Sequence, residues 1–215
     1  MADISHGRPG YSRRKAPRQR RSRVTVDAIK QAALDLAARE GFGAAGTHEI
    51  AAKAGVSIGS LYQYFPNREA IYLSLYEQTV ATAVGQIKAQ MPAILDAPME
   101  QAVRGTIKHL IALYARNRLV LLDLRDQVPE LHLDTSPVSV RPMLHGMLRV
   151  FLAQRARRAS AAENETKAHF LEQVMLGTIQ NYVREHPLGM SERVFTDHLS
   201  AIVLAYLRFT RASGG

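Results

Sequence analysis

The chain has 215 residues, of which 47% are hydrophobic and 22% are charged, so it is long enough and apolar enough to bury a core. It contains no cysteine, which excludes disulfides, thiolate nucleophiles and cysteine-ligated metal centres. No apolar run approaches the roughly 20 residues that span a bilayer, and no apolar segment follows the N-terminal arginines. We therefore expect a soluble, cytoplasmic protein.

The net charge of +9 is concentrated at the N-terminus. Residues 1–23 contain eight Arg and Lys side chains against one Asp, so the rest of the chain carries only +2. We predict that this segment is a disordered basic arm, because its composition cannot bury a core. Such an arm either binds DNA phosphates by releasing counterions or is a solvated tail, and its charge also permits RNA or a membrane surface as a partner. Its candidate phosphate contacts are Arg18, Arg20, Arg21 and Arg23.

After the arm, apolar residues recur at spacings of three and four, which predicts an all-α fold. Thr25 is expected to cap the first helix and Gly41 to end it. Three prolines between residues 119 and 142 predict a short helix and a loop there, and His186 to Gly189 predict a sharp break. Pro92 and Pro98 are expected to bracket a connector. The predicted helices are 26–40, 47–54, 57–65, 67–90, 99–117, 142–160, 163–185 and 191–211.

Residues 47–64 form the most informative segment. Thr47 is the expected cap of a short helix that Gly55 ends, and Ser57 is the expected cap of a second short helix. A small Ala51 and a glycine four residues later are what two closely crossing helices require. The pattern predicts a DNA-binding helix-turn-helix whose second helix enters a major groove, although caps and glycine stops also occur in ordinary helical hairpins.

The sequence Gly-Val-Ser-Ile-Gly-Ser-Leu-Tyr-Gln-Tyr-Phe-Pro-Asn-Arg-Glu-Ala-Ile-Tyr, residues 55–72, resembles the DNA-binding domain of the TetR family of bacterial regulators. Ser60 and Arg68 replace the family's usual threonine and lysine, and each substitution is conservative. The resemblance extends over about residues 25–75. It implies a three-helix DNA-binding domain at 24–70, followed by a larger helical domain for ligand binding and dimerisation at 71–215.

Carried over by position, the resemblance assigns DNA contacts to the two short helices and the start of the next. Thr47, Tyr62 and Arg68 are expected to hold phosphates. The domain 24–70 has a net charge of −1, so the arm is expected to supply much of the nonspecific attraction to DNA. The full set of predicted contacts is Thr47, Ser57, Ile58, Gly59, Ser60, Tyr62, Tyr64 and Arg68.

The second domain is expected to pair with a second copy and to hold a small molecule. By resemblance, the last two helices form a four-helix bundle with their mates; burial within the same subunit is the alternative for each residue. The predicted interface residues are Phe170, Val174, Gly177, Thr178, Phe195, Leu199, Ile202, Val203 and Tyr206. The predicted pocket residues, which mix apolar and polar side chains, are His109, Leu113, Tyr114, Leu121, Met143, Met147, Phe151 and Gln173. Each of these also suits an ordinary core.

No catalytic constellation is evident, and the histidines show no metal-ligand spacing, so we predict neither an enzyme nor a metal site or cofactor. The sequence thus favours a ligand-responsive regulator, by family expectation a repressor, that binds a palindromic operator as a homodimer. A ligand-independent nucleoid or nucleic-acid packaging protein is the alternative. An all-helical enzyme or carrier with an incidental hairpin is a third interpretation.

Overall fold

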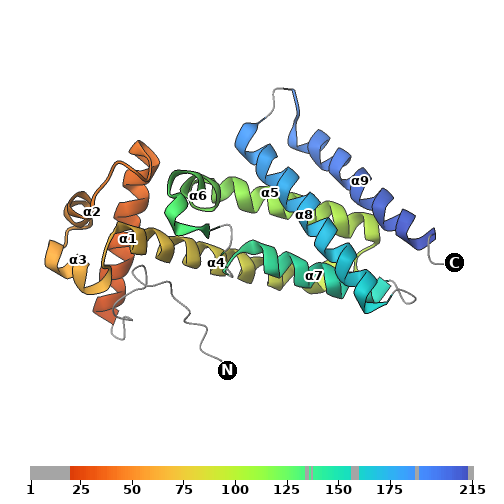
Figure 1. The fold of residues 1–215 in the computed structure, drawn as a ribbon, viewed down its shortest axis with the longest axis horizontal. Helices are drawn as coiled ribbons and strands as arrows, with labels where there is room; N and C mark the ends of the chain where they lie inside the picture. Colours follow the sequence, from red (N-terminus) through yellow and green to blue (C-terminus); the bar gives the residue numbers. More distant parts are fainter. Residues whose placement is uncertain (1–19, 134–135, 137, 156–159, 187–188, 213–215) are drawn as a thin grey trace. The chain divides into compact units, whose positions relative to one another are not determined.

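The computed structural model describes residues 20–133, 136, 138–155, 160–186 and 189–212, and these residues contain helices and no strand (Figure 1). The predicted all-α fold is confirmed. Among the described residues, no helix combines the length and the apolarity that crossing a bilayer requires. The α-helices are α1 (Arg20–Glu40), α2 (Thr47–Ala54), α3 (Ile58–Tyr64), α4 (Arg68–Asp96), α5 (Met99–Arg116), α6 (Leu124–Gln127), α7 (Val140–Arg155), α8 (Ala161–Glu185) and α9 (Glu192–Ala212).

The chain divides into two compact units. The first comprises Met1–Thr79 and Leu119–Ser136, and the second comprises Val80–Arg118 and Pro137–Gly215. Helix α4 contributes residues to both units, because the division falls between Thr79 and Val80.

The first helix begins earlier than the sequence predicted. Helix α1 starts at Arg20, so Thr25 lies inside it and the prediction that Thr25 caps the helix is wrong. Arginine favours helix, so the arginines that precede Thr25 extend the helix and do not interrupt it. Arg20, Arg21 and Arg23 of the predicted arm therefore belong to α1, while Arg18 lies outside the described residues.

Helix α2 has the predicted bounds but a different cap. Its N-cap is Gly46, whose backbone N–H donates to Glu49 Oε2 at 2.9 Å, and Thr47 is the first residue of the helix. The prediction that Thr47 is the cap is therefore wrong. The Glu49 carboxylate in the first turn accepts the N–H of the cap residue, and its negative charge interacts favourably with the N-terminus of the helix.

The core of the first unit is built around two aromatic side chains. Phe42 and Tyr72 meet edge to face with ring centroids 5.0 Å apart, and the Tyr72 hydroxyl donates to the Phe42 carbonyl at 2.9 Å. The Phe42 N–H donates to Gln127 Oε1 at 2.8 Å, which ties α6 to the end of α1. Ile29 and Ile71 are fully buried beside them. This packing holds α1 and the start of α4 in a fixed position beside the helix-turn-helix.

Helix α4 continues through Pro92 to Asp96, so the predicted end near residue 90 is wrong. A proline inside a helix leaves one carbonyl four residues earlier without its usual donor, a local cost that packing of the rest of the helix offsets. Arg155 of α7 donates to the Leu95 carbonyl at 3.0 Å and to the Ala97 carbonyl, and so satisfies acceptors at the C-terminus of α4.

The proline-rich stretch after α5 is confirmed as short helical pieces and a loop. A π-helix covers Leu119–Asp123, α6 follows, and a 3-10 helix covers Pro129–Leu131. Helix α7 begins at Val140, two residues before the predicted start, and α8 begins after the cap Ser160. The predicted break between α8 and α9 is confirmed, since His186 and Gly189 both have positive φ, at 42° and 82°.

The second unit is a helical bundle in which α8 packs against α5 and α7, and α9 packs against α5. Helices α8 and α9 run antiparallel (Figure 1). Their rings meet at both ends, because Phe170 lies 4.8 Å from Tyr206 and Tyr182 lies 4.1 Å from Phe195, measured between centroids. Buried aliphatic side chains such as Ile107, Leu110 and Ile179 fill the interior.

Candidate functional site

Helices α2 and α3 form a tight helix-turn-helix. Gly55 adopts φ +67°, the left-handed conformation that the turn requires, and the Val56 N–H donates to the Ala51 carbonyl at 3.1 Å. Ser57 is the N-cap of α3 and accepts from the Ser60 N–H at 3.1 Å, as predicted. Ile50 and Leu61 are fully buried, so they fix the crossing of the two helices.

The outer face of α3 consists of the residues that are exposed to solvent. Gly59, Tyr62 and Gln63 are exposed, whereas Ile58, Ser60 and Tyr64 are half-buried. A Cβ added to Gly59 would meet nothing within 4 Å, so the helix backbone is open there. The sequence did not single out Gln63, although its position four residues after Gly59 places it on the same face of the helix. Tyr64 lies further toward the buried side.

Two predicted contact residues are brought together across the two helices. The Thr47 hydroxyl at the start of α2 lies 2.9 Å from the Tyr62 hydroxyl of α3. Tyr62 is 39% exposed, so this pair faces solvent and is not part of the core. The Ser57 and Ser60 hydroxyls lie 2.8 Å apart at the N-terminus of α3. The two short helices thus carry two exposed pairs of hydroxyls, which can donate hydrogen bonds to anions.

Arg68 has a different setting from the one predicted. Its Nη1 donates to the Gly43 carbonyl at 2.9 Å, and its Nε donates to Glu69 Oε1 at 2.9 Å. The hydrogen bond to Glu69 raises the pKa of Arg68 above its ordinary value, so the guanidinium stays charged. These bonds tie the start of α4 to the loop after α1. Arg68 therefore serves the fold of the first unit, and its predicted phosphate contact stays a prediction.

Arg68→Ala is expected to lower the free energy of unfolding by about 1–2 kcal/mol, because two hydrogen bonds from a charged donor are lost at a partly exposed position. Urea denaturation measures this change. Loss of the predicted phosphate contact should also reduce the slope of log Kd against log salt for DNA by about 1, whereas a role in the fold alone leaves that slope unchanged. Arg39→Ala, at an exposed arginine of α1, is the charge-matched control. A reduced salt slope with an unchanged free energy of unfolding would show that Arg68 contacts phosphate and does not stabilise the fold.

Other cations in the first unit are also engaged. Lys30 donates to Gln78 and lies 3.7 Å from Asp27, and Lys53 lies 3.8 Å from Asp35. The surface around α2 and α3 therefore offers few uncompensated positive charges. This fits the expectation that the arm supplies nonspecific attraction, a role that stays a prediction.

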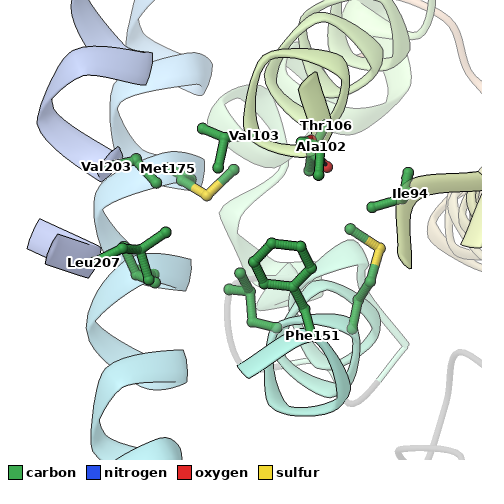
Figure 2. A pocket seen from close by; sticks show the side chains of 11 residues that line it. Ile94, Ala102, Val103, Thr106, Phe151, Met175, Val203 and Leu207 are labelled. Atoms are coloured by element: carbon green, nitrogen blue, oxygen red, sulfur yellow. Dashed lines mark hydrogen bonds between the residues drawn. The ribbon is translucent and has the colours of Figure 1, made fainter. Parts of the chain in front are cut away.

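A cavity lies within the second unit, between α5, α7, α8, α9 and the end of α4. Its volume is about 30 Å³, and it is partly open to solvent. Figure 2 shows Phe151 projecting from α7 into the middle of the lining side chains. The single polar side chain in the wall is Thr106, whose hydroxyl already donates to the Ala102 carbonyl at 2.8 Å. The lining residues are Ile94, Ala102, Val103, Thr106, Met147, Leu148, Phe151, Leu171, Met175, Val203 and Leu207.

Of the predicted pocket residues, Met147 and Phe151 line this cavity. Met143 lies in an open groove that shares Met147 with the cavity and has a volume of about 570 Å³. The other predicted residues are elsewhere: His109 and Gln173 are exposed, Leu113 and Tyr114 are buried away from the cavity, and Leu121 belongs to the first unit. The sequence missed most of the lining, because an aliphatic residue on a helix indicates burial but does not distinguish a cavity wall from a packed core.

The outer surface of α8 and α9 carries exposed apolar side chains. Ile202 is 59% exposed and Phe170 is 48% exposed. Around them, Gly177 and Thr178 are exposed, while Val174, Phe195 and Tyr206 are half-buried. Leu199 and Val203, two other predicted interface residues, are instead buried within the subunit, on the side of α9 that packs against α5. The predicted interface residues therefore divide between two faces of the same helix.

Residues 29–75 match the family model described as bacterial regulatory proteins, tetR family. A candidate TetR-family transcriptional regulator from Mesorhizobium loti has a similar structure, with a TM-score of 0.69, 20% identity, and coverage of 89% of this chain and 98% of that one. The fatty acid degradation regulator FadR from Bacillus halodurans follows with a TM-score of 0.65, 19% identity, and coverage of 88% and 96%.

FadR from Bacillus subtilis, solved in complex with stearoyl-CoA, gives a TM-score of 0.62 at 22% identity and covers 84% of this chain and 96% of its own. No curated protein sequence is significantly similar to the chain. The likeness to these structures concerns the fold, and the family match concerns the segment that carries the helix-turn-helix. Residues 29–75 thus match the tetR family of bacterial regulatory proteins, and the fold of the chain is similar to that of TetR-family regulators.

Proposed function

We propose that the protein is a ligand-responsive transcriptional repressor that binds a palindromic DNA site as a homodimer. The observation that carries the proposal is the outward face of α3, with Gly59, Tyr62 and Gln63 exposed above a buried Leu61. A helix with small side chains near its N-terminus can approach base edges in a major groove, which is about 12 Å wide. An exposed glutamine on that face can read adenine with two hydrogen bonds, so we include Gln63 among the base contacts.

In this proposal the paired hydroxyls of Thr47 and Tyr62 hold a phosphate. At a separation of 2.9 Å, one hydroxyl donates its proton to the other, and the second hydroxyl can donate its own proton to a phosphate oxygen. Both hydroxyls come from helices whose positions the buried core fixes. Phosphate contacts set the register of the protein on the duplex, and base contacts then specify sequence. The Thr47–Tyr62 pair would therefore orient α3 in the groove.

Dimerisation follows from the limits of a single short helix. One copy of α3 reads too few base pairs for useful specificity, and two copies about 34–36 Å apart reach successive turns of the groove. The exposed apolar side chains of α8 and α9, chiefly Phe170 and Ile202, support pairing through this surface. The exposed Gly177 between them permits close helix approach.

The ligand in this proposal is predominantly apolar. Among the described residues that line the cavity of the second unit, one side chain, Thr106, is polar and none is charged. The FadR structures from Bacillus subtilis and Thermus thermophilus are complexes with stearoyl-CoA and lauroyl-CoA, which supports a ligand with an apolar chain. Ligand binding would favour a conformation in which the two copies of α3 no longer match the half-site spacing.

The test is a footprint on the DNA that adjoins the protein's own coding region, repeated with medium-chain and long-chain acyl-CoA. A sharp footprint over one inverted repeat that an acyl-CoA removes supports the proposal. A specific site should bind at least about 1,000-fold more tightly than random DNA of equal length. Equal, salt-sensitive binding to random DNA would instead indicate a packaging protein.

A further inference from the structure

Helices α7 and α8 are joined by a row of charged and polar side chains. Arg141, His145 and Arg149 are spaced four residues apart on α7, so they share one face of that helix. Glu165, His169 and Glu172 form the matching row on α8. Arg141 bonds Glu172, and Arg149 Nε lies 2.9 Å from Glu165 Oε2.

His145 stands between two carboxylates. Its Nε2 lies 2.9 Å from Glu165 Oε1, and its Nδ1 lies 3.3 Å from Glu172 Oε2. A neutral imidazole has one N–H donor and one lone pair, so it can satisfy only one of these carboxylates. The lone pair on the other nitrogen then faces a carboxylate oxygen, and the two repel each other. A cation between this nitrogen and this oxygen would bind both and remove the repulsion.

His169 completes a set of three metal-ligating groups. Ligand atoms of His145, His169 and Glu172 all lie within 4.8 Å of one another. His169 and Glu172 are three residues apart on α8, so they project from the same face. His169 is exposed, and its recorded interaction within the described part of the chain is a ring contact with His145, at 6.2 Å between centroids. Its ring is therefore free to rotate toward the other two.

We propose that His145, His169 and Glu172 bind a divalent transition-metal ion. Bonds of about 2.0–2.2 Å in a tetrahedral site place neighbouring ligand atoms about 3.3–3.5 Å apart. The Nδ1 to Oε2 distance of 3.3 Å between His145 and Glu172 already has this value. Rotation of His169 closes the remaining gap, and the exposed side of the cluster leaves the fourth position to water.

The surrounding side chains suit this role. A metal-binding histidine commonly donates its second N–H to a carboxylate, and Glu165 is placed to accept it from Nε2. Arg141 bonds Oε1 of Glu172, which leaves Oε2 facing His145. Glu172 is nearly fully buried, so its carboxylate has a fixed position. Glu165 and Arg141 are thus positioning residues for the two ligands nearest the core.

The ligand atoms, and not the net charge, determine which metal ion the site favours. Two arginines already offset the two carboxylates of the row, so net negative charge does not drive cation binding. Two imidazole nitrogens favour Zn²⁺, Co²⁺, Ni²⁺ or Cu²⁺, and they disfavour Mg²⁺ and Ca²⁺, which require oxygen ligands. The site is distinct from the apolar cavity, which Met147, Phe151 and Leu171 line from other faces of the same two helices.

The test uses the full chain without a histidine tag, stripped of metal by a chelator and dialysed. Titration with Co²⁺ should give the visible absorption of a tetrahedral Co²⁺ centre at one ion per chain, and Zn²⁺ but not excess Mg²⁺ should displace it. His169→Ala should retain the fold, since the side chain is exposed, and should weaken binding at least about tenfold. Glu165→Gln should weaken binding by a similar factor through His145.

His109→Ala is the matched control, because His109 is an exposed histidine on α5 outside the cluster. It should bind Co²⁺ as the unsubstituted chain does, and circular dichroism should confirm that all variants are equally helical. Absence of a one-to-one tetrahedral signal would overturn the proposal. So would a signal that His169→Ala leaves unchanged, and the row would then be an ion-pair network alone.

Discussion

Tyr62→Ala should lower the affinity of the dimer for its DNA site at least about 100-fold. A hydrogen bond to a charged phosphate contributes about 1.5–3 kcal/mol, and the two half-sites lose it twice. Tyr62 is 39% exposed, so its removal leaves the core of the first unit intact. Fluorescence anisotropy with a labelled duplex at fixed salt measures the change, and the melting temperature confirms that the variant is folded.

The hydroxyl pair allows a sharper form of this experiment. Thr47→Val and Tyr62→Phe each remove one hydroxyl of the 2.9 Å pair, so their effects on affinity should be strongly non-additive in a double-mutant cycle. Tyr182→Phe is the matched tyrosine control, because its hydroxyl donates to the Met190 carbonyl in the second unit. Additive effects, or a Tyr62→Ala variant that binds DNA with full affinity, would show that Tyr62 does not contact the DNA.

Ile202→Glu should convert the proposed dimer to a monomer at micromolar concentration. The side chain is 59% exposed in the single chain, so a carboxylate there is harmless to the monomer. In a paired interface it would be buried without a partner, and an unpaired buried charge costs about 3–5 kcal/mol. Because both copies carry the change, the dimer dissociation constant should rise at least about 100-fold. Sedimentation velocity measures the shift.

Loss of pairing should also abolish tight binding to the palindrome while leaving weak binding to a half-site. Val150→Glu is the control, since Val150 is a similarly exposed apolar residue, at 45%, on α7. That variant should remain dimeric. A dimeric Ile202→Glu protein would show that the outer face of α8 and α9 is not the pairing surface.

The sequence predicted the helix-turn-helix well because each of its boundaries depends on one residue with a strong local preference. Gly55 supplies the left-handed turn and Ser57 supplies the cap, and both act within a few residues. Thr47 shows the limit of this reasoning. Its hydroxyl was expected to cap α2, but the N-cap is Gly46, whose N–H the Glu49 carboxylate accepts, and the Thr47 hydroxyl lies against Tyr62.

Contacts between distant segments could not be predicted from local patterns. Arg68 matches a family position, but its bond to the Gly43 carbonyl depends on how the loop after α1 folds back. Leu199 and Ile202 have the same apolar character, and only the packing of α9 on α5 separates a buried leucine from an exposed isoleucine. The His145 cluster was missed for a related reason, since its residues come from two helices and have no fixed spacing along the chain.

The central claim is that the exposed face of α3 meets base edges, and a disulfide-trapping measurement tests it most directly. The chain has no cysteine, so Gly59→Cys creates a single thiol on that face, and the open space around Gly59 accommodates it. With duplexes carrying a thiol-tethered base, Gly59→Cys should crosslink at two major-groove positions about one helical turn apart. Gly85→Cys, an equally open site on α4, should not crosslink. Binding of the duplex without crosslinking from Gly59→Cys, or equal crosslinking from both variants, would contradict the claim.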